Sequence, residues 1–349
     1  MAITQDYCDF ATGNDYKGAS FVDGAWTAAT HTLTKAGAFA ATKVNHWLYL
    51  EPNGGASFTA GYYRVATVPD ANSVTLASDP AVGNLTDVKC TQHDGTTTLP
   101  WRSLQGAFDL LTRNSSDGNQ VNLKAGTAQV NAAALDLTVF IAAGALSAAG
   151  PLIIRGYTAS ANDGGVGEID CGGAPMFAAT TYDYVMLIDL EMHTFGDNNG
   201  IVLDQQCLIY RCELHKGASS PSSRTLATLA GSGAIVGCYV HDSGAGIDVC
   251  IALPQSGVAI GNYILPTSYR GISCGSNAVI SGNIFKGSTT SFQAIIYDGT
   301  GPATVIGNVA YNSAAGTQMC LYLGNAAGRY ARMCINNIIV GQSGAGGKG

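Results

Sequence analysis

The sequence predicts an all-β protein in which a single-stranded parallel β-helix occupies residues 98–341, preceded by a small β domain and a capping helix. Two observations favour this fold class. Short apolar segments recur through the C-terminal half of the chain, and their internal pattern stays in phase. In addition, only 12% of the residues are charged and 45 are glycine, which favours many short strands and tight turns over long helices with charged faces.

The recurring segments align on a single column. They are LIDLEMH (187–193), IYRCELH (209–215), IVGCYVH (235–241), AIGNYIL (259–265), ISGNIFK (280–286), VIGNVAY (305–311) and INNIIV (335–340). Successive positions of the column are 21 to 29 residues apart, and they hold Leu190, Cys212, Cys238, Asn262, Asn283, Asn308 and Asn337, the last segment being entered one residue late. Variable intervals with a constant phase are typical of stacked coils whose loops differ in length.

A second apolar strand follows most of these segments, for example GIVLD (200–204), GISCG (271–275) and CLYLG (320–324). Each coil therefore holds at least two short strands, separated by Gly, Asn or Ser residues that tolerate tight bends. Stacked coils of this kind form parallel sheets whose neighbouring rungs lie about 4.8 Å apart. A β-sandwich is disfavoured because local hairpin signals are scarce in this region.

The recurring xxGNxx and GIxx segments resemble those of the right-handed, pectate-lyase-like β-helix superfamily, which includes polysaccharide lyases, glycoside hydrolases and phage tailspikes. The column Asn262, Asn283, Asn308 and Asn337 is similar to the asparagine ladder at one bend of that fold. The resemblance covers residues 98–341 and implies a right-handed solenoid, most like the β-helix proteins of phage virions. It specifies the fold better than the activity, since this scaffold carries unrelated functions.

The stretch 94–126 fits the entrance to such a solenoid. Pro100 suits a first helical turn, and Leu104, Phe108 and Leu111 fall on one face of a helix predicted over residues 100–114. That helix would cover the apolar end of the stack, which would otherwise expose unpaired backbone. The Gly-rich segment 342–349 reads as a flexible tail.

Residues 1–97 show short β-patterned runs between Gly, Asn, Pro and Asp turns and predict a separate β domain. All three tryptophans, Trp26, Trp47 and Trp101, lie at or before the capping helix. Large aromatic side chains anchor interfaces as readily as cores, so this end is the candidate for attachment and for oligomer contacts. The alternative is that the three rings fill a small core.

Charge and cysteine content limit the function classes. The net charge is −7 and no Lys/Arg cluster occurs, which argues against nucleic acid and anionic membrane as partners. The N-terminus shows neither a signal peptide nor an apolar anchor, so synthesis in a reducing host cytoplasm is expected. Ten cysteines without a Cys-x-x-Cys motif are too sparse for a disulfide scaffold and indicate buried thiols.

The segment CLIYRCELH (207–215) places Cys207, Cys212 and His215 at a spacing that resembles half of a zinc site. Side chains alternate between the two faces of a strand, so Cys212 and His215 should point to opposite sides. The local zinc site is therefore disfavoured, and Cys212 and Cys238 are interpreted as occupants of the asparagine column in earlier rungs.

One column of titratable residues is a candidate for metal binding or catalysis. His193, His215 and His241 recur at one position of consecutive rungs, and Glu191 and Glu213 stand two residues before the first two. These side chains could stack and hydrogen-bond, bind a transition metal, or supply acid and base groups. The candidate metal ligands are His193, His215 and His241, the candidate catalytic residues are Glu191, Glu213, His241 and Asp242, and no cofactor is expected.

The favoured function is that of a structural protein of a bacteriophage-like virion, either a capsid decoration protein or a tail fibre or spike component. Its expected partners are other virion proteins and further copies of itself, with a host surface glycan as an additional candidate. The alternative is a carbohydrate-active lyase or hydrolase, in which Glu191 and Glu213 approach the separation of a retaining glycosidase pair, about 5 Å, and Tyr239 and Tyr263 stack on sugar rings. The sequence favours a role without catalysis, because the calcium-binding aspartates and arginine base of the pectate lyases are missing.

Overall fold

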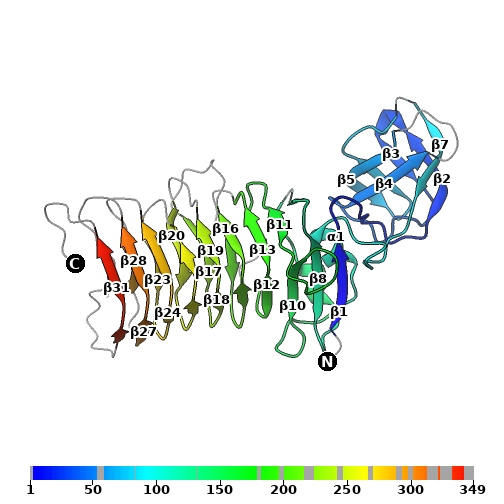
Figure 1. Cartoon of the computed structure of the whole chain (residues 1–349). Coiled ribbons are helices and arrows are strands. Elements are labelled where there is room, and N and C mark those ends of the chain that lie inside the picture. The colour runs from blue at the N-terminus through cyan, green and yellow to red at the C-terminus, as the bar shows by residue number, and fades with distance from the viewer. Residues whose placement is uncertain are drawn as a thin grey trace.

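The computed structural model describes residues 3–341 apart from 53–58, 82, 132, 179–181, 196–199, 216–223, 242–246, 266–269, 288–292, 298–301, 313–320 and 323–331. The chain is an all-β protein built from a parallel β-helix and an antiparallel barrel (Figure 1). The predicted tail 342–349 lies outside the described residues. Among the described residues, no helix is long and apolar enough to cross a membrane.

Three parallel sheets run along the solenoid, in agreement with the expectation of at least two short strands per coil. The first sheet comprises β1 (Thr4–Cys8), β8 (Asn119–Lys124), β10 (Leu152–Tyr157), β12 (Val185–Ile188), β15 (Leu208–Tyr210), β18 (Ala234–Val236), β21 (Val258–Ile260), β24 (Val279–Ser281), β27 (Ala303–Ile306) and β30 (Arg332–Ile335). The second comprises β9 (Gln129–Val130), β11 (Gly167–Asp170), β13 (Leu190–His193), β16 (Glu213–His215), β19 (Tyr239–His241), β22 (Tyr263–Ile264), β25 (Ile284–Gly287), β28 (Val309–Asn312) and β31 (Ile338–Gly341). The third comprises β14 (Ile201–Leu203), β17 (Arg224–Leu229), β20 (Ile247–Leu253), β23 (Arg270–Cys274), β26 (Gln293–Tyr297) and β29 (Leu321–Tyr322).

Each recurring segment spans a bend between two sheets, which explains the third strand per coil. In IVGCYVH, for example, the first-sheet strand β18 ends at Val236 and the second-sheet strand β19 begins at Tyr239. Between them Gly237 has φ of +63°, and Gly261, Gly282 and Gly307 repeat this left-handed angle at +64° to +65° in later rungs. Glycine adopts such angles without steric cost, so the GN pair marks the bend itself.

Asparagine side chains connect the rungs at this bend. Asn283 donates from Nδ2 to Asn308 Oδ1 over 2.9 Å, and its own Oδ1 accepts from Nδ2 of Asn262 over 2.8 Å. Asn308 donates in the same way to Asn337 over 2.9 Å. One rung earlier, Cys238 donates from its backbone N–H to Asn262 Oδ1, and its Sγ accepts from the N–H of Cys212 over 3.4 Å. The buried amides and thiols therefore form one continuous ladder.

The helix at the solenoid entrance is shorter than predicted. It is α1 (Leu104–Leu110) rather than 100–114, because the Ser103 side chain caps its start by accepting from Gly106 N–H and the backbone turns extended at Leu111. A second short helix, α2 (Thr138–Ala142), contacts α1 and was not foreseen. Both helices cover the first rungs, where the ring centroids of Phe108 and Phe140 lie 6.3 Å apart with the ring planes tilted by 41°.

The barrel is closed by six antiparallel strands, with the short helix η1 (Ala28–Thr30) after the first of them. Its boundary differs from the predicted domain 1–97, because β1 pairs in parallel with β8 and so belongs to the solenoid. By adding a strand, β1 covers the edge of the first rung. The barrel strands are β2 (Phe21–Thr27), β3 (Thr32–Thr34), β4 (Trp47–Pro52), β5 (Gly61–Asp70), β6 (Ser73–Leu76) and β7 (Leu85–Cys90).

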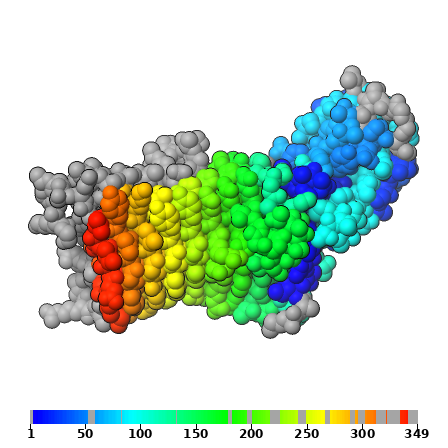
Figure 2. All heavy atoms as spheres, viewed as in Figure 1, coloured from blue at the N-terminus to red at the C-terminus, as the bar shows by residue number. Residues whose placement is uncertain are grey.

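Asp15 is one of the buried carboxylates that join the barrel to the cap. Asp15 accepts from the backbone N–H groups of Arg102 and Ser103 and from that of Trp47, the first residue of β4. The Arg102 and Ser103 N–H groups bond Oδ1 of Asp15, while the Trp47 N–H and the Ser103 hydroxyl bond Oδ2. Figure 2 shows the barrel as a lobe at one end of the stacked rungs.

The tryptophans do not act together as a surface. Trp26 and Trp101 are each 1% exposed, the first in the barrel core and the second in the solenoid core, so neither ring can reach a partner. Only Trp47 is partly exposed, beside the guanidinium of Arg102. The predicted interface at Trp26 and Trp101 is therefore wrong in its residues, because each ring fills the core of its own lobe.

Candidate functional site

The candidate site lies on the outward face of the second sheet. In β11, β13, β16 and β19 the residues alternate, so that Ile169, Met192, Leu214 and Val240 point into the core while their neighbours point to solvent. The outward side chains form what we call the Glu–His row, which consists of Glu168, Glu191, Glu213, His193, His215 and His241.

Strand register sets the order within the row. Glu168 pairs with Glu191 and Glu191 with Glu213, while His215 pairs with His241. The carboxylates therefore form one file along the solenoid and the imidazoles a parallel file. Glu168 was missed in the sequence because its strand, GEID, follows a long loop and lacks the apolar run that precedes the bend in the recurring segments. The signal that could have found it is the match of Glu-Ile-Asp to Glu-Met-His in the next rung.

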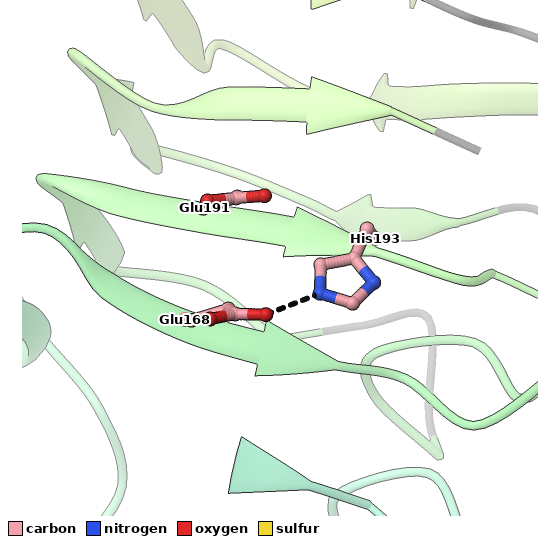
Figure 3. Close-up of side chains that lie close together, drawn as sticks. All are labelled: Glu168, Glu191 and His193. Atoms are coloured by element: carbon pink, nitrogen blue, oxygen red, sulfur yellow. Dashed lines mark hydrogen bonds and ion pairs between the residues drawn. The ribbon is translucent and has the colours of Figure 1, made fainter. Parts of the chain in front are cut away.

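Each imidazole bonds the carboxylate one rung earlier. The Nε2 to Oε1 distance is 3.0 Å for His193 and Glu168, as Figure 3 shows, and 3.0 Å for His215 and Glu191. The third pair, His241 and Glu213, is closer at 2.7 Å. On the other side of the first ring, Nδ1 of His193 lies 2.7 Å from the hydroxyl of Thr194. The imidazoles are thus oriented by partners, as acid, base or ligand groups require.

Ring stacking fixes the row further. The centroids of His193 and His215 lie 5.0 Å apart, and those of His215 and His241 also 5.0 Å, with 18° between planes in both cases. Tyr239 stacks on His241 at 4.1 Å and on Tyr263 at 5.6 Å. Tyr239 thus stacks on two rings, one in its own strand and one in the next rung. The sugar-stacking role of Tyr239 and Tyr263 stays a prediction.

The carboxylates approach one another closely. Ligand atoms of Glu168, Glu191 and His193 lie within 4.8 Å of one another, and the same holds for Glu191, Glu213 and His215. Glu191 belongs to both groups. Carboxyl groups at this separation can act as a proton donor and a nucleophile on either side of a scissile bond, and carboxylate and imidazole together can also hold a cation.

The remaining predicted site residues are not part of this arrangement. Asp242, a candidate catalytic residue, lies outside the described residues. Cys207 and Cys212 are buried, and Sγ of Cys212 faces the backbone carbonyl of Leu187 rather than His215. The three residues that resemble a zinc half-site thus lie on two different faces, as alternation along the strand predicts.

The comparisons with known proteins add little to this site. No protein-family model matches the chain, and no curated protein matches it. One solved structure that resembles it is the catalytic domain of a GH87 α-1,3-glucanase in complex with tetrasaccharides, at 11% identity and a TM-score of 0.33, covering 96% of this chain and 88% of that chain. A likeness at this level carries no argument about chemistry.

Proposed function

We propose that the chain is a carbohydrate-active β-helix protein that cleaves a glycan lying across the Glu–His row. The observation that supports this is the pair of carboxylates one rung apart whose oxygens lie within 4.8 Å of each other. Retaining glycosidases place their two carboxyl groups about 5 to 5.5 Å apart. The virion role stays a prediction, and no comparison supports it.

In this proposal one carboxyl group protonates the glycosidic oxygen while its neighbour attacks the anomeric carbon. The covalent intermediate is then hydrolysed by water, and the first group returns as the base. The histidines act as positioning residues, because each Nε2 holds one oxygen of a glutamate through a bond of 2.7 to 3.0 Å and leaves that carboxyl group in a fixed orientation.

The test is a screen of polysaccharides for new reducing ends, followed by the variant Glu191→Gln. Glu191 takes part in both close groups, so this one change breaks both carboxylate pairs. We expect cleavage by the natural chain and its loss in the variant, by at least about a hundredfold, as for removal of an acid or base group. Glu51→Gln is the matched control, because Glu51 lies on the barrel and pairs with Lys89.

The outcome also has a stereochemical check. A retaining pair must release the sugar with the anomeric configuration of the substrate, which NMR of the fresh product reports. Absence of cleavage across the screen, or full activity of Glu191→Gln, would contradict the proposal.

A further inference from the structure

A second site candidate lies where the barrel meets the capping helix, beside β9, the strand that pairs with β11 of the second sheet. A cleft of about 480 Å³ opens there, within the size range of small-molecule sites. Lys43 and Trp47 line it from the barrel, Asp109 from α1, and Asn131 and Asp136 from the segment after β9. The cleft therefore exists only because the two lobes are joined.

A relay of buried amides ends in this cleft. The N–H of Leu104 donates to Gln129 Oε1 over 3.3 Å, which turns Nε2 of Gln129 toward Asn131. That Nε2 donates to Asn131 Oδ1 over 3.4 Å. The orientation of the Asn131 amide follows, because its oxygen must face Gln129 and its Nδ2 must face away.

Asn131 Nδ2 has no acceptor among the described residues, although the side chain is only 6% exposed. A buried donor without an acceptor costs about 1 to 3 kcal/mol, so this amide gains stability from any acceptor that reaches it, an ordered water or a ligand oxygen. Since Asn131 lines the cleft, a ligand there could supply an oxygen atom.

The charges around the cleft indicate whether the ligand that carries this oxygen is anionic or neutral. Asp109 is already held by Lys43 at 3.2 Å and by His46 at 3.0 Å, so the lysine charge is balanced. Asp136 is ionised, because hydrogen bonds from Thr138 lower the pKa of its carboxyl group. An anionic ligand would meet this carboxylate, whereas a neutral hydroxyl can donate to it.

We propose that the cleft binds a neutral saccharide unit. One sugar oxygen accepts from Asn131 Nδ2, one hydroxyl donates to Asp136, and the C–H face of the ring lies against Trp47, the apolar wall of the cleft. Hydroxylated rings combine these properties, since they carry donors, acceptors and an apolar face without charge. The cleft shares no lining residue with the Glu–His row, although its β9 residues pair with β11 at the start of that row.

The test uses the full chain and a panel of neutral disaccharides, namely maltose, cellobiose, lactose and chitobiose, with binding measured by calorimetry and ligand-observed NMR. The central variant is Asn131→Asp, which keeps the oxygen facing Gln129 and replaces only the donor. We expect at least one sugar to bind the natural chain and to bind the variant at least about tenfold more weakly.

A second variant in the cleft wall and a control variant outside the cleft show whether the sugar binds in the cleft. Val139→Trp places a bulky ring at an exposed position of the cleft wall without touching the buried amides, and it should also abolish binding, which keeps the test valid if Asn131→Asp fails to fold. Glu51→Gln, at a barrel residue outside both sites, should bind the sugar as the natural chain does. The proposal is overturned if no sugar of the panel binds, or if Asn131→Asp and Val139→Trp bind normally.

Discussion

Replacing Asn283 by leucine tests the asparagine ladder at its centre. The Asn283 side chain takes part in four hydrogen bonds: Oδ1 accepts from N–H and from Nδ2 of Asn262 over 3.0 and 2.8 Å, and Nδ2 donates to Ala259 O and Asn308 Oδ1 over 2.9 Å each. The side chain is fully buried, so water cannot take over these roles.

The expected loss follows from what the leucine leaves behind. The backbone N–H of Asn262 loses its acceptor, which costs about 1 to 3 kcal/mol, and each of the other three bonds contributes about 0.5 to 1.5 kcal/mol. Burial of the leucine side chain returns about 1.5 to 3 kcal/mol. The net result is a free energy of unfolding about 3 kcal/mol lower than that of the natural chain.

Asn283→Cys is the matched control, because the ladder already contains thiols. In the natural chain Cys238 Sγ accepts the N–H of Cys212 over 3.4 Å, so a cysteine at 283 can accept from Asn262 in the same way. We expect this variant to lose about half as much stability as the leucine variant. Urea unfolding followed by circular dichroism measures both. Equal stability of the leucine variant and the natural chain, or equal losses in the two variants, would refute the ladder as a source of stability.

Two further predictions concern single groups. Burial raises the pKa of Asp6 to about 6 from 3.8, so the folded state binds more protons than the unfolded state in this window, and stability should fall as pH rises from about 4 to about 6. Asp6→Asn should remove that fall and raise the free energy of unfolding near pH 7 by up to about 3 kcal/mol. Urea titrations at several pH values measure both effects. A variant with the same pH profile as the natural chain would contradict this prediction. Gly282→Ala should cost about 1 to 2 kcal/mol in the same assay, because φ is +64° while an added Cβ meets no atom within 4 Å. Gly282→Asn should cost less, since Asn336 adopts φ of +54° in a later rung, and equal losses in the two variants would argue against backbone strain as the cause.

The fold could be predicted from the sequence wherever local chemistry repeats. The Gly-Asn pair recurs at 261–262, 282–283 and 307–308 because these bends hold a left-handed residue and then a buried amide, so alignment of the segments placed the ladder in register. Trp26 and Trp101 carry no such signal. Whether a ring fills a core depends on packing between segments distant in sequence, such as the isolated bridge between Trp101 and Cys8.

The candidate sites were predictable to different degrees. The histidine file follows from spacing within matching segments, whereas Glu168 stands in a strand with a different approach loop. The cleft could not be foreseen, because its residues come from the barrel, from α1 and from the segment after β9. The orientation of the Asn131 amide depends on Gln129, which in turn depends on the backbone of the capping helix.

The Asp15 joint has a mechanical consequence for the cleft between barrel and cap. Because one buried carboxylate binds backbone groups of β4 and of the cap at once, the two lobes cannot swing independently without breaking several hydrogen bonds together. The barrel-side residues of the cleft, Lys43 and Trp47, therefore keep a constant position relative to Asn131 and Asp136 on the solenoid side. The joint thus sets the width of the opening, which thermal motion of two loosely linked lobes would otherwise vary.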